Sequence, residues 1–259
     1  MSQEQSEGII FEKEGRIAKI IINRPSKMNS ITKEMGEELN RVARIINQDS
    51  DIAVVLLTSV GERSFSTGSD IKLLHQYGTP FELRNREDYC AAIRSIRKPV
   101  VAKVRGYALG GGLELLLTAD IRYTDPTATF AVSEVHHGWT SGSGATQHLG
   151  RLMSYNQAAE LVLTGKKFDA EEAYRLGIIN DIIPSEELDA HVDGVLAQMS
   201  EQSTIAMQLI KQNLRSTQNI GIDAGLQYEN DLFAFSFTTD DAKEGQAAFA
   251  EKRKPVFTK

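Results

Sequence analysis

Short, strongly apolar runs rich in β-branched residues alternate with helical segments along the first half of this chain. Such runs lie at residues 17–22, 53–57 and 100–104. A continuous apolar run of this length is typical of a strand that is buried on both faces. Between the first two runs, apolar residues recur at helical spacing, namely Met35, Leu39, Val42 and Ile46. Thr32 can cap that helix, and the alternation predicts an α/β fold with crossover connections.

The second half of the chain has a different pattern. Shorter strands are expected at residues 121–123, 129–132 and 178–183. Gly177 can close a helix over 170–176. From residue 185 onward the pattern predicts helices alone, at 185–199, 204–214, 222–235 and 240–252. No linker or low-complexity segment separates the two halves. The sequence therefore predicts an α/β core over residues 1–195 and a helical region over residues 196–259.

The composition excludes several classes of protein. The 259 residues are 41% hydrophobic and 25% charged, which is typical of a globular chain. The net charge of -6 and the pI of about 5.5 disfavour a general binder of nucleic acid or anionic membranes. The N-terminus lacks the features of a signal or transit peptide, and no apolar run is long enough to span a bilayer. We therefore expect a cytoplasmic protein with no membrane or nucleic-acid partner.

A single cysteine, Cys90, excludes an intramolecular disulfide and a metal site built from several cysteines. We expect it to be an inert buried thiol.

Three glycine-bearing segments, at residues 65–72, 106–114 and 133–147, each precede a predicted helix. Glycine lets a backbone approach a ligand closely, and the first N–H groups of a helix have no partner within the helix. Such N–H groups can bind an anion or polarise a carbonyl group. Three such segments in one α/β core favour a ligand-binding site over three ordinary turns.

Neither common nucleotide-binding loop is present. No segment has the spacing of a phosphate-binding loop, and the glycines at 110–112 and at 142 and 144 lack the dinucleotide spacing. The sequence therefore disfavours ATP and NAD. No Gly-x-Ser-x-Gly motif occurs, and Ser69 and Ser143 have no evident His and Asp partners.

Two glutamates, Glu114 and Glu134, lie beside the second and third glycine-bearing segments. Two carboxyl groups in unlike environments can divide the roles of general acid and general base. Taken singly, each glutamate also fits an ordinary structural role, because acidic residues favour the first turn of a helix. On an extended segment, His136 and His137 would point to opposite faces. We expect these histidines and Trp139 to line a pocket or pack, and we predict no metal site.

Six motifs in chain order resemble the enoyl-CoA hydratase (crotonase) superfamily, over nearly the whole chain. They are NRP at 23–25 with Asn29, FSTGSDIK at 65–72, KPVVA at 98–102, GYALGGGLEL at 106–115, EG at 244–245 and FAEKRK at 249–254. The resemblance implies a spiral of ββα units whose C-terminal helices mediate formation of a homotrimer or homohexamer. It also implies an acyl-CoA substrate, whose thioester oxygen would lie between the backbone N–H groups of Ser69 and Gly111 in an oxyanion hole.

The resemblance further implies a set of substrate-binding residues. They are Arg24, Lys27, Gly68, Asp70, Lys72, His137, Trp139, Gly142 and Lys252. Among them, Arg24, Lys27 and Lys72 match positions that contact coenzyme A. Lys252 resembles a lysine that reaches the coenzyme A phosphates bound to a neighbouring subunit. Because coenzyme A is a polyanion and the chain is acidic, the resemblance requires cations to be gathered locally.

Within this superfamily, Glu114 and Glu134 match the glutamate pair of the hydratases. The resemblance therefore implies syn addition of water to a 2-enoyl-CoA, or the reverse, with no metal or redox cofactor. Other reactions of the superfamily remain alternatives: double-bond isomerisation, thioester hydrolysis and C–C bond cleavage. A non-catalytic binder of coenzyme A or RNA and a serine peptidase of related fold are further alternatives, and the retained carboxylate pair and the acidic balance disfavour them.

The segment after Glu134 departs from the usual hydratase pattern. Ser141 stands in place of a proline and Ala145 in place of a glycine, and two histidines and Trp139 lie nearby. These differences predict a polar, cyclic or branched acyl group rather than a plain straight-chain one.

Overall fold

The computed structural model describes residues 7–257 of the chain. Residues 1–6, which carry most of the N-terminal segment used above to predict the cellular compartment, lie outside that range. The described chain begins with an antiparallel hairpin of β1 (Gly8–Glu14) and β2 (Ile17–Asn23). Helix α1 (Lys33–Gln48) follows, and the Thr32 side chain accepts a hydrogen bond from the Met35 backbone N–H, which confirms the predicted cap. No helix in the described range is long and apolar enough to cross a bilayer.

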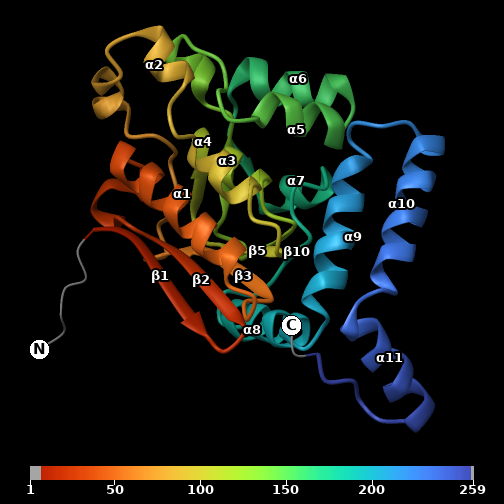
Figure 1. Cartoon of the computed structure of the whole chain (residues 1–259). Helices are drawn as coiled ribbons and strands as arrows, with labels where there is room; N and C mark the ends of the chain where they lie inside the picture. The colour runs from red at the N-terminus through yellow and green to blue at the C-terminus, as the bar shows by residue number, and fades with distance from the viewer. Residues whose placement is uncertain (1–6, 258–259) are drawn as a thin grey trace, which may run out of the picture.

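Six strands form the larger sheet, in the order β1-β2-β3-β5-β7-β10. After the hairpin, the added strands are β3 (Val54–Ser59), β5 (Val100–Val104), β7 (Ile121–Thr124) and β10 (Asp181–Ile182), all paired in parallel. The side chains from Val54 to Thr58 are all buried, which confirms the prediction of a strand covered on both faces. Figure 1 shows this sheet between α1 on one side and α8 on the other.

A smaller sheet holds four strands in the order β4-β6-β8-β9. They are β4 (Ser64–Ser66), β6 (Tyr107–Leu109), β8 (Thr129–Ala131) and β9 (Phe168–Asp169). Each of β3, β5 and β7 in the larger sheet is followed along the chain by β4, β6 and β8 in the smaller one. The chain therefore winds between two sheets, which confirms the predicted α/β spiral.

Short helices connect and cover these strands. They are η1 (Pro25–Lys27), η2 (Ile71–Gln76), α2 (Pro80–Arg84), α3 (Tyr89–Arg94), α4 (Gly111–Leu117), η3 (Glu134–His137), α5 (Ala145–Leu152), α6 (Tyr155–Thr164) and α7 (Ala170–Arg175). Helix α4 is the most enclosed of these helices, because six of its seven residues are buried. Its packing matters for the site, since Glu114 is one of those six residues.

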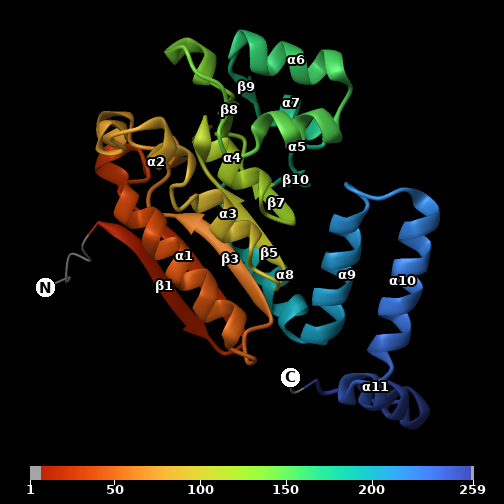
Figure 2. The ribbon, with the colours of Figure 1, turned by 45° about the horizontal axis from the view of Figure 1, so that its top comes forward.

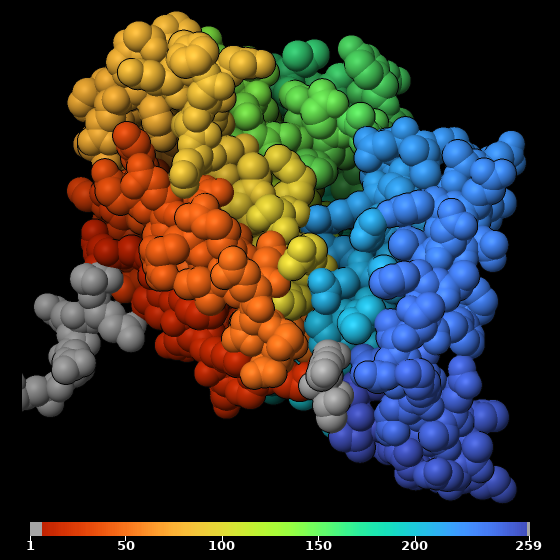
Figure 3. Space-filling view, in the orientation of Figure 1, coloured from red at the N-terminus to blue at the C-terminus, as the bar shows by residue number. Residues whose placement is uncertain are grey.

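Four helices make up the C-terminal part of the chain: α8 (Leu188–Ser200), α9 (Thr204–Ser216), α10 (Ile222–Ser236) and α11 (Asp240–Glu251). Helix α8 packs on the larger sheet through Leu188, Val192 and Leu196. Figures 2 and 3 show α9 beside the core, with α10 and α11 further out. The boundary predicted between residues 195 and 196 falls inside α8, and the division into a core and a helical region stays a prediction.

Helix α9 is held to the core by a buried cation. Lys211 Nζ lies 2.6 Å from Asp120 Oδ2 and donates a 2.7 Å hydrogen bond to the Lys98 carbonyl oxygen. Burial lowers the Lys211 pKa to about 8, although the Asp120 carboxylate opposes that effect. The lowered value means that desolvation outweighs the attraction of the pair.

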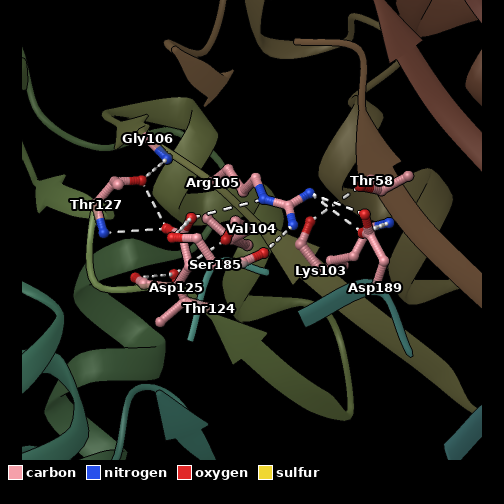
Figure 4. Close-up of polar contacts among 10 residues, drawn as sticks. All are labelled: Thr58, Lys103, Val104, Arg105, Gly106, Thr124, Asp125, Thr127, Ser185 and Asp189. Carbon is pink, nitrogen blue, oxygen red and sulfur yellow. Dashed lines mark hydrogen bonds and ion pairs between the residues drawn. The ribbon is translucent and has the colours of Figure 1, made fainter. Parts of the chain in front are cut away.

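A second polar cluster fixes the N-terminus of α8 against the strand ends (Figure 4). The Arg105 guanidinium donates to Asp189 Oδ1 at 3.1 Å and to the Ser185 carbonyl oxygen at 2.7 Å. Its Nε also lies 3.6 Å from the buried Asp125 carboxylate. Asp125 in turn accepts hydrogen bonds from the hydroxyls of Ser185 and Thr127. These contacts join the segment before α8 to the turns that follow β5 and β7.

Two expectations need correction in this part of the chain. The strand predicted over 178–183 is confined to β10, because Ile178 and Ile179 pack their side chains into the core from a turn. The prediction that His136 and His137 point to opposite faces assumed an extended segment, and this assumption does not hold, because both belong to the 3-10 helix η3. The thiol of Cys90 is fully buried, as predicted, and burial raises its pKa well above the ordinary value.

Candidate active site

A cavity of about 670 Å³ opens between the segment that follows β4 and the segment that follows β8. Its lining includes most of the residues proposed from the sequence: Lys27, Ser69, Asp70, Lys72, Gly111, Glu114, Glu134, His137, Trp139 and Gly142. The spiral brings them together because β4, β6 and β8 are neighbours in the smaller sheet. These three strands run parallel, so their carboxyl ends lie at the same edge of the sheet. The segments that follow the strands therefore converge there.

The Ser69 backbone is oriented by a single parallel bridge to Ile31. The Ile31 N–H donates to the Gly68 carbonyl oxygen at 2.8 Å, and the Asp70 N–H donates to the Ile31 carbonyl oxygen at 2.9 Å. Because successive residues of an extended chain direct their N–H groups to opposite sides, the Ser69 N–H points away from Ile31. It makes no hydrogen bond within residues 7–257, and Ser69 lines the cavity.

The second such N–H group belongs to Gly111, the first residue of α4, which has no acceptor within its own helix and none elsewhere in the described chain. The Ser69 and Gly111 segments touch directly. A Cβ added to Gly68 would lie 2.6 Å from the Gly111 nitrogen. Gly68 itself has a φ of 81°, a conformation that side chains disfavour. The two free donors therefore lie side by side at one wall of the cavity.

The glycine triplet at 110–112 is required by close packing. Gly110 has a φ of 54°. A Cβ on Gly111 would collide with the Tyr89 hydroxyl, and one on Gly112 would collide with the Ser66 carbonyl oxygen. These contacts explain in physical terms why the sequence has no side chain at these three positions.

Glu114 is buried, and its carboxylate is anchored by backbone groups. Its Oε1 accepts hydrogen bonds from the N–H groups of Ser143 at 2.8 Å and Ala145 at 3.1 Å. Ser143 precedes α5 and Ala145 begins it. The third glycine-bearing segment, residues 133–147, therefore anchors Glu114, which ends the second one. The Oε2 atom makes no hydrogen bond to the part of the chain that the structure describes, and Glu114 lines the cavity. It is therefore available to a bound molecule.

Glu134 lies at the start of η3 and is also buried. Its Oε2 is enclosed and has no hydrogen-bond partner among residues 7–257. Burial raises the pKa of the Glu134 carboxyl, and the nearby Glu114 carboxyl adds to the rise, opposed by a hydrogen bond from the backbone. A carboxyl group in this environment holds its proton more firmly than an exposed one, which suits a general acid.

The two histidines after Glu134 have separate environments. His136 Nε2 lies 3.0 Å from the Gly165 carbonyl oxygen and faces α6. His137 stacks on Trp139, with ring centroids 5.0 Å apart and an interplanar angle of 25°. Both rings of this stack line the cavity, and Trp139 remains 43% exposed. His137 and Trp139 therefore form an aromatic wall at the cavity mouth, whereas His136 packs away from it.

Three proposed residues do not line the cavity. Arg24 is paired with Asp70, with 2.7 Å between Nη1 and Oδ2, and Gly68 lies behind Ser69 against Gly111. Lys252 follows α11 in a left-handed conformation with a φ of 55°, in the outer part of the helical region. Its proposed contact requires a second subunit, so that role stays a prediction.

Among the cavity residues that sequence reasoning missed, Tyr89 and Arg86 make polar contacts with other parts of the lining. The buried Tyr89 hydroxyl lies 3.1 Å from the Ser69 hydroxyl, and burial raises the pKa of Tyr89 well above its ordinary value. Arg86 precedes α3 and reaches Gly142 and Ser143. Both residues come from the 77–89 segment, which carries no motif that indicates a binding or catalytic role. Its local signals concern only helix starts: the capping box of Thr79 and Glu82 before α2, and the N-cap residue Asp88 before α3.

The two-sheet spiral and a cavity with two unbonded N–H groups beside two buried carboxyl groups define a protein of the crotonase class. Comparison with known proteins agrees. Residues 12–259 match the enoyl-CoA hydratase/isomerase family, and the chain belongs to this family.

Individual relatives match almost end to end. The chain is 34% identical to the short-chain-enoyl-CoA hydratase of Clostridium acetobutylicum, covering 95% of each. It is 35% identical to the crotonyl-CoA hydratase of Syntrophomonas wolfei, covering 97% of this chain and 98% of the relative. The crystal structure of an enoyl-CoA hydratase from Bacillus anthracis superposes with a TM-score of 0.88 at 30% identity, covering 97% of this chain and 99% of that chain.

Proposed function

We propose that this chain is an enoyl-CoA hydratase, which adds water in a syn sense to a 2-enoyl-CoA to give a 3-hydroxyacyl-CoA, or catalyses the reverse. The observation that carries the proposal is one cavity that holds two unbonded N–H groups and two buried carboxyl groups. The relatives from Clostridium acetobutylicum and Syntrophomonas wolfei, both named as hydratases, support the same reaction.

The two N–H groups act on the thioester. Its carbonyl oxygen accepts hydrogen bonds from Ser69 and Gly111, and it gains negative charge as the enolate develops. Donors fixed in advance stabilise such an oxyanion more than the ground-state carbonyl, by about 3–4 kcal/mol for one donor. Tyr89 supports this arrangement, because its hydroxyl packs against Gly111 and bonds the Ser69 side chain.

The two carboxyl groups move the protons. Glu114, whose Oε1 is fixed by two N–H groups, orients a water molecule through Oε2. The water oxygen forms a bond to C3 of the enoyl group and gives up a proton to Glu114. The C2 atom takes a proton from Glu134, whose buried carboxyl retains one readily. Proton exchange with solvent then restores both groups, and dehydration follows the same steps in reverse.

Cations at the cavity mouth support binding of coenzyme A. Lys27 and Lys72 both line the opening, although the chain as a whole carries a net charge of -6. Their local placement favours phosphate groups there. The polar cavity residues Thr140 and His137 support a polar acyl group, one of the classes predicted from the sequence. The reaction proposed here takes place on the thioester itself and needs no metal or redox cofactor.

The helical region supports assembly into a homotrimer or homohexamer. Large apolar side chains on α9 to α11 and their connections are exposed: Ile210, Leu214, Ile222, Leu226, Phe233, Phe235, Phe237 and Phe249. A soluble monomer rarely exposes such a set, whereas a subunit interface buries it.

A Phe233→Arg, Phe235→Arg double variant should dissociate the assembly in sedimentation measurements. An assembly of unchanged mass would contradict the use of this surface.

A panel of acyl-CoA thioesters tests the proposed activity. Hydratase activity predicts loss of the conjugated enoyl absorbance with crotonyl-CoA and formation of a 3-hydroxyacyl-CoA. Release of free coenzyme A, migration of the double bond or a shortened acyl chain would instead identify a hydrolase, an isomerase or a C–C lyase. A serine peptidase is disfavoured, because the Ser69 and Ser143 hydroxyls bond Tyr89 and Arg86, and neither bonds a histidine within residues 7–257.

A further inference from the structure

Arg86 joins the two walls of the cavity. It lies between α2 and α3, in the wall that follows Ser69. Its Nη1 donates to the Leu83 carbonyl oxygen at 2.9 Å, within its own segment. Its Nη2 crosses to the opposite wall, where it donates to the Ser143 hydroxyl at 3.0 Å and to the Gly142 carbonyl oxygen at 3.3 Å. One planar guanidinium therefore spans both segments.

Arg86 donates hydrogen bonds to Gly142 and Ser143, in the same segment whose backbone N–H groups bind the Glu114 carboxylate. The Ser143 N–H donates to Glu114 Oε1 at 2.8 Å, and the Ala145 N–H donates to the same atom at 3.1 Å. Ser143 thus accepts a hydrogen bond from Arg86 through its hydroxyl and donates one to the Glu114 carboxylate through its backbone N–H. In the described part of the chain, Arg86 is the only side chain that donates a hydrogen bond to residues 140–144.

The Arg86 guanidinium is not used to neutralise a carboxylate. No Asp or Glu oxygen of the described residues lies within 4.0 Å of it. All three of its hydrogen bonds go to neutral oxygens, and the residue is half-buried at the cavity. Arginine is well suited to hold a loop, because its planar guanidinium group can donate hydrogen bonds to several acceptors at once.

We propose that Arg86 is a positioning residue for Glu114, which acts through Ser143 and Gly142 to keep the carboxylate aligned with the water that it orients. The inference rests on the proposed hydratase function. Without Arg86, residues 142–143 lose their link to the opposite wall, and the two N–H donors on Glu114 Oε1 lose their fixed direction. A displacement of about 1 Å at a reacting group can lower a rate by about 100-fold.

The first test compares Arg86→Met with Arg84→Met. Arg84 ends α2, is exposed and does not line the cavity, so its replacement is a matched control. We expect Arg86→Met to lower kcat for crotonyl-CoA hydration by about 10- to 100-fold with little change in KM. Arg86→Lys should recover part of the loss, because an ammonium group can reach one acceptor but not span both. Arg84→Met should match the wild type.

The second test separates positioning of Glu114 from general damage to the site. Exchange of the α-proton of butyryl-CoA with deuterium oxide needs Glu134 and the oxyanion hole but adds no water. We therefore expect Arg86→Met to retain the exchange rate while it loses hydration. In a Glu114→Gln background, Arg86→Met should cause no further loss, because both changes remove one function.

These outcomes can overturn the inference. Equal losses of hydration and exchange, or losses that multiply in the double variant, would show that Arg86 does not act through Glu114. If Arg86→Met does not fold, Ser143→Ala removes the hydroxyl acceptor alone and should show a smaller loss confined to hydration. If the wild-type chain exchanges the α-proton but hydrates no enoyl-CoA, the proposed function is wrong, and the proposed role of Arg86, which rests on it, is wrong as well.

Discussion

The carboxyl groups of Glu114 and Glu134 face one cavity and are held in opposite ways. Oε1 of Glu114 accepts two backbone N–H groups, whereas Oε2 of Glu134 is buried without a partner among residues 7–257. The first arrangement fixes the direction of the Glu114 carboxylate, and the second favours a Glu134 carboxyl group that retains its proton, because burial raises its pKa. This asymmetry divides the two roles that acid–base catalysis of hydration requires.

Replacing Glu134 by glutamine should remove the proton donor while the shape of the cavity is kept. We expect kcat for crotonyl-CoA to fall by about 10²- to 10⁴-fold, with KM within a few-fold of the wild type. Steady-state kinetics of the purified variant measure both constants. Turnover close to that of the wild type would remove Glu134 from the mechanism.

The pH dependence of the hydration rate should report the same group. In the proposed mechanism hydration uses the protonated form of Glu134, so kcat/KM should fall as the pH rises through the raised pKa of the Glu134 carboxyl. Glu134→Gln should lack this descending limb in its residual activity. A wild-type profile that is flat on the alkaline side would contradict the assignment of the acid.

Glu134→Gln should also make the protein more stable above the ordinary glutamate pKa of 4.5. The pKa is raised in the folded protein, so the folded state binds more protons than the unfolded state, and stability falls as the pH rises from 4.5 through the raised value. Glutamine removes that penalty. Thermal unfolding should give a higher Tm for the variant at pH 8 and a smaller difference near pH 4.5.

The Lys211 and Asp120 pair should respond asymmetrically to substitution. Asp120→Ala leaves a buried ammonium group with its Lys98 carbonyl contact alone and should destabilise the chain by about 3–5 kcal/mol. Lys211→Met should be near neutral. The folded state binds fewer protons at Lys211 between pH about 8 and 10.5, so the free energy of unfolding should rise with pH there, and Lys211→Met should abolish that rise. Denaturant titrations at pH 7 and 10 check both points.

Two glycine substitutions should have opposite effects. Gly112→Ala drives a Cβ into the Ser66 carbonyl oxygen, a backbone atom, and should destabilise the chain by about 3 kcal/mol and abolish activity. Gly194 lies inside α8 with open space around it, and Gly194→Ala should stabilise the chain by about 0.5–1 kcal/mol. Denaturant unfolding of both variants tests the comparison, and equal effects would contradict it.

Local signals predicted much of the fold. The run at 53–57 and the cap at Thr32 were sufficient for β3 and α1, because burial on two faces and an N-cap leave marks within a few residues. The strands β4 and β6 escaped prediction, because each is three residues long and overlaps a glycine-bearing segment that was interpreted as a loop. Their pairing is nevertheless what brings Ser69 beside Gly111.

The candidate site was predicted only in part for the same reason. Glycine-bearing segments and nearby glutamates are visible in the sequence, but the convergence of Glu114 and Glu134 depends on long-range pairing. Arg86 and Tyr89 come from a segment whose local signals mark helix starts alone, and their roles depend on contacts across the cavity. The predicted contact of Lys252 with coenzyme A would need a second subunit, and it stays a prediction.

The close backbone contact between Gly68 and Gly111 limits how the sequences of such a family can diverge. The two backbones touch there and leave no room for an added atom, so the two donors of the proposed oxyanion hole cannot vary without loss of the contact. The outer walls, at residues 77–88 and 135–142, carry mostly exposed side chains with space around them. New acyl preferences can therefore arise by drift in these walls while the reaction centre is inherited unchanged.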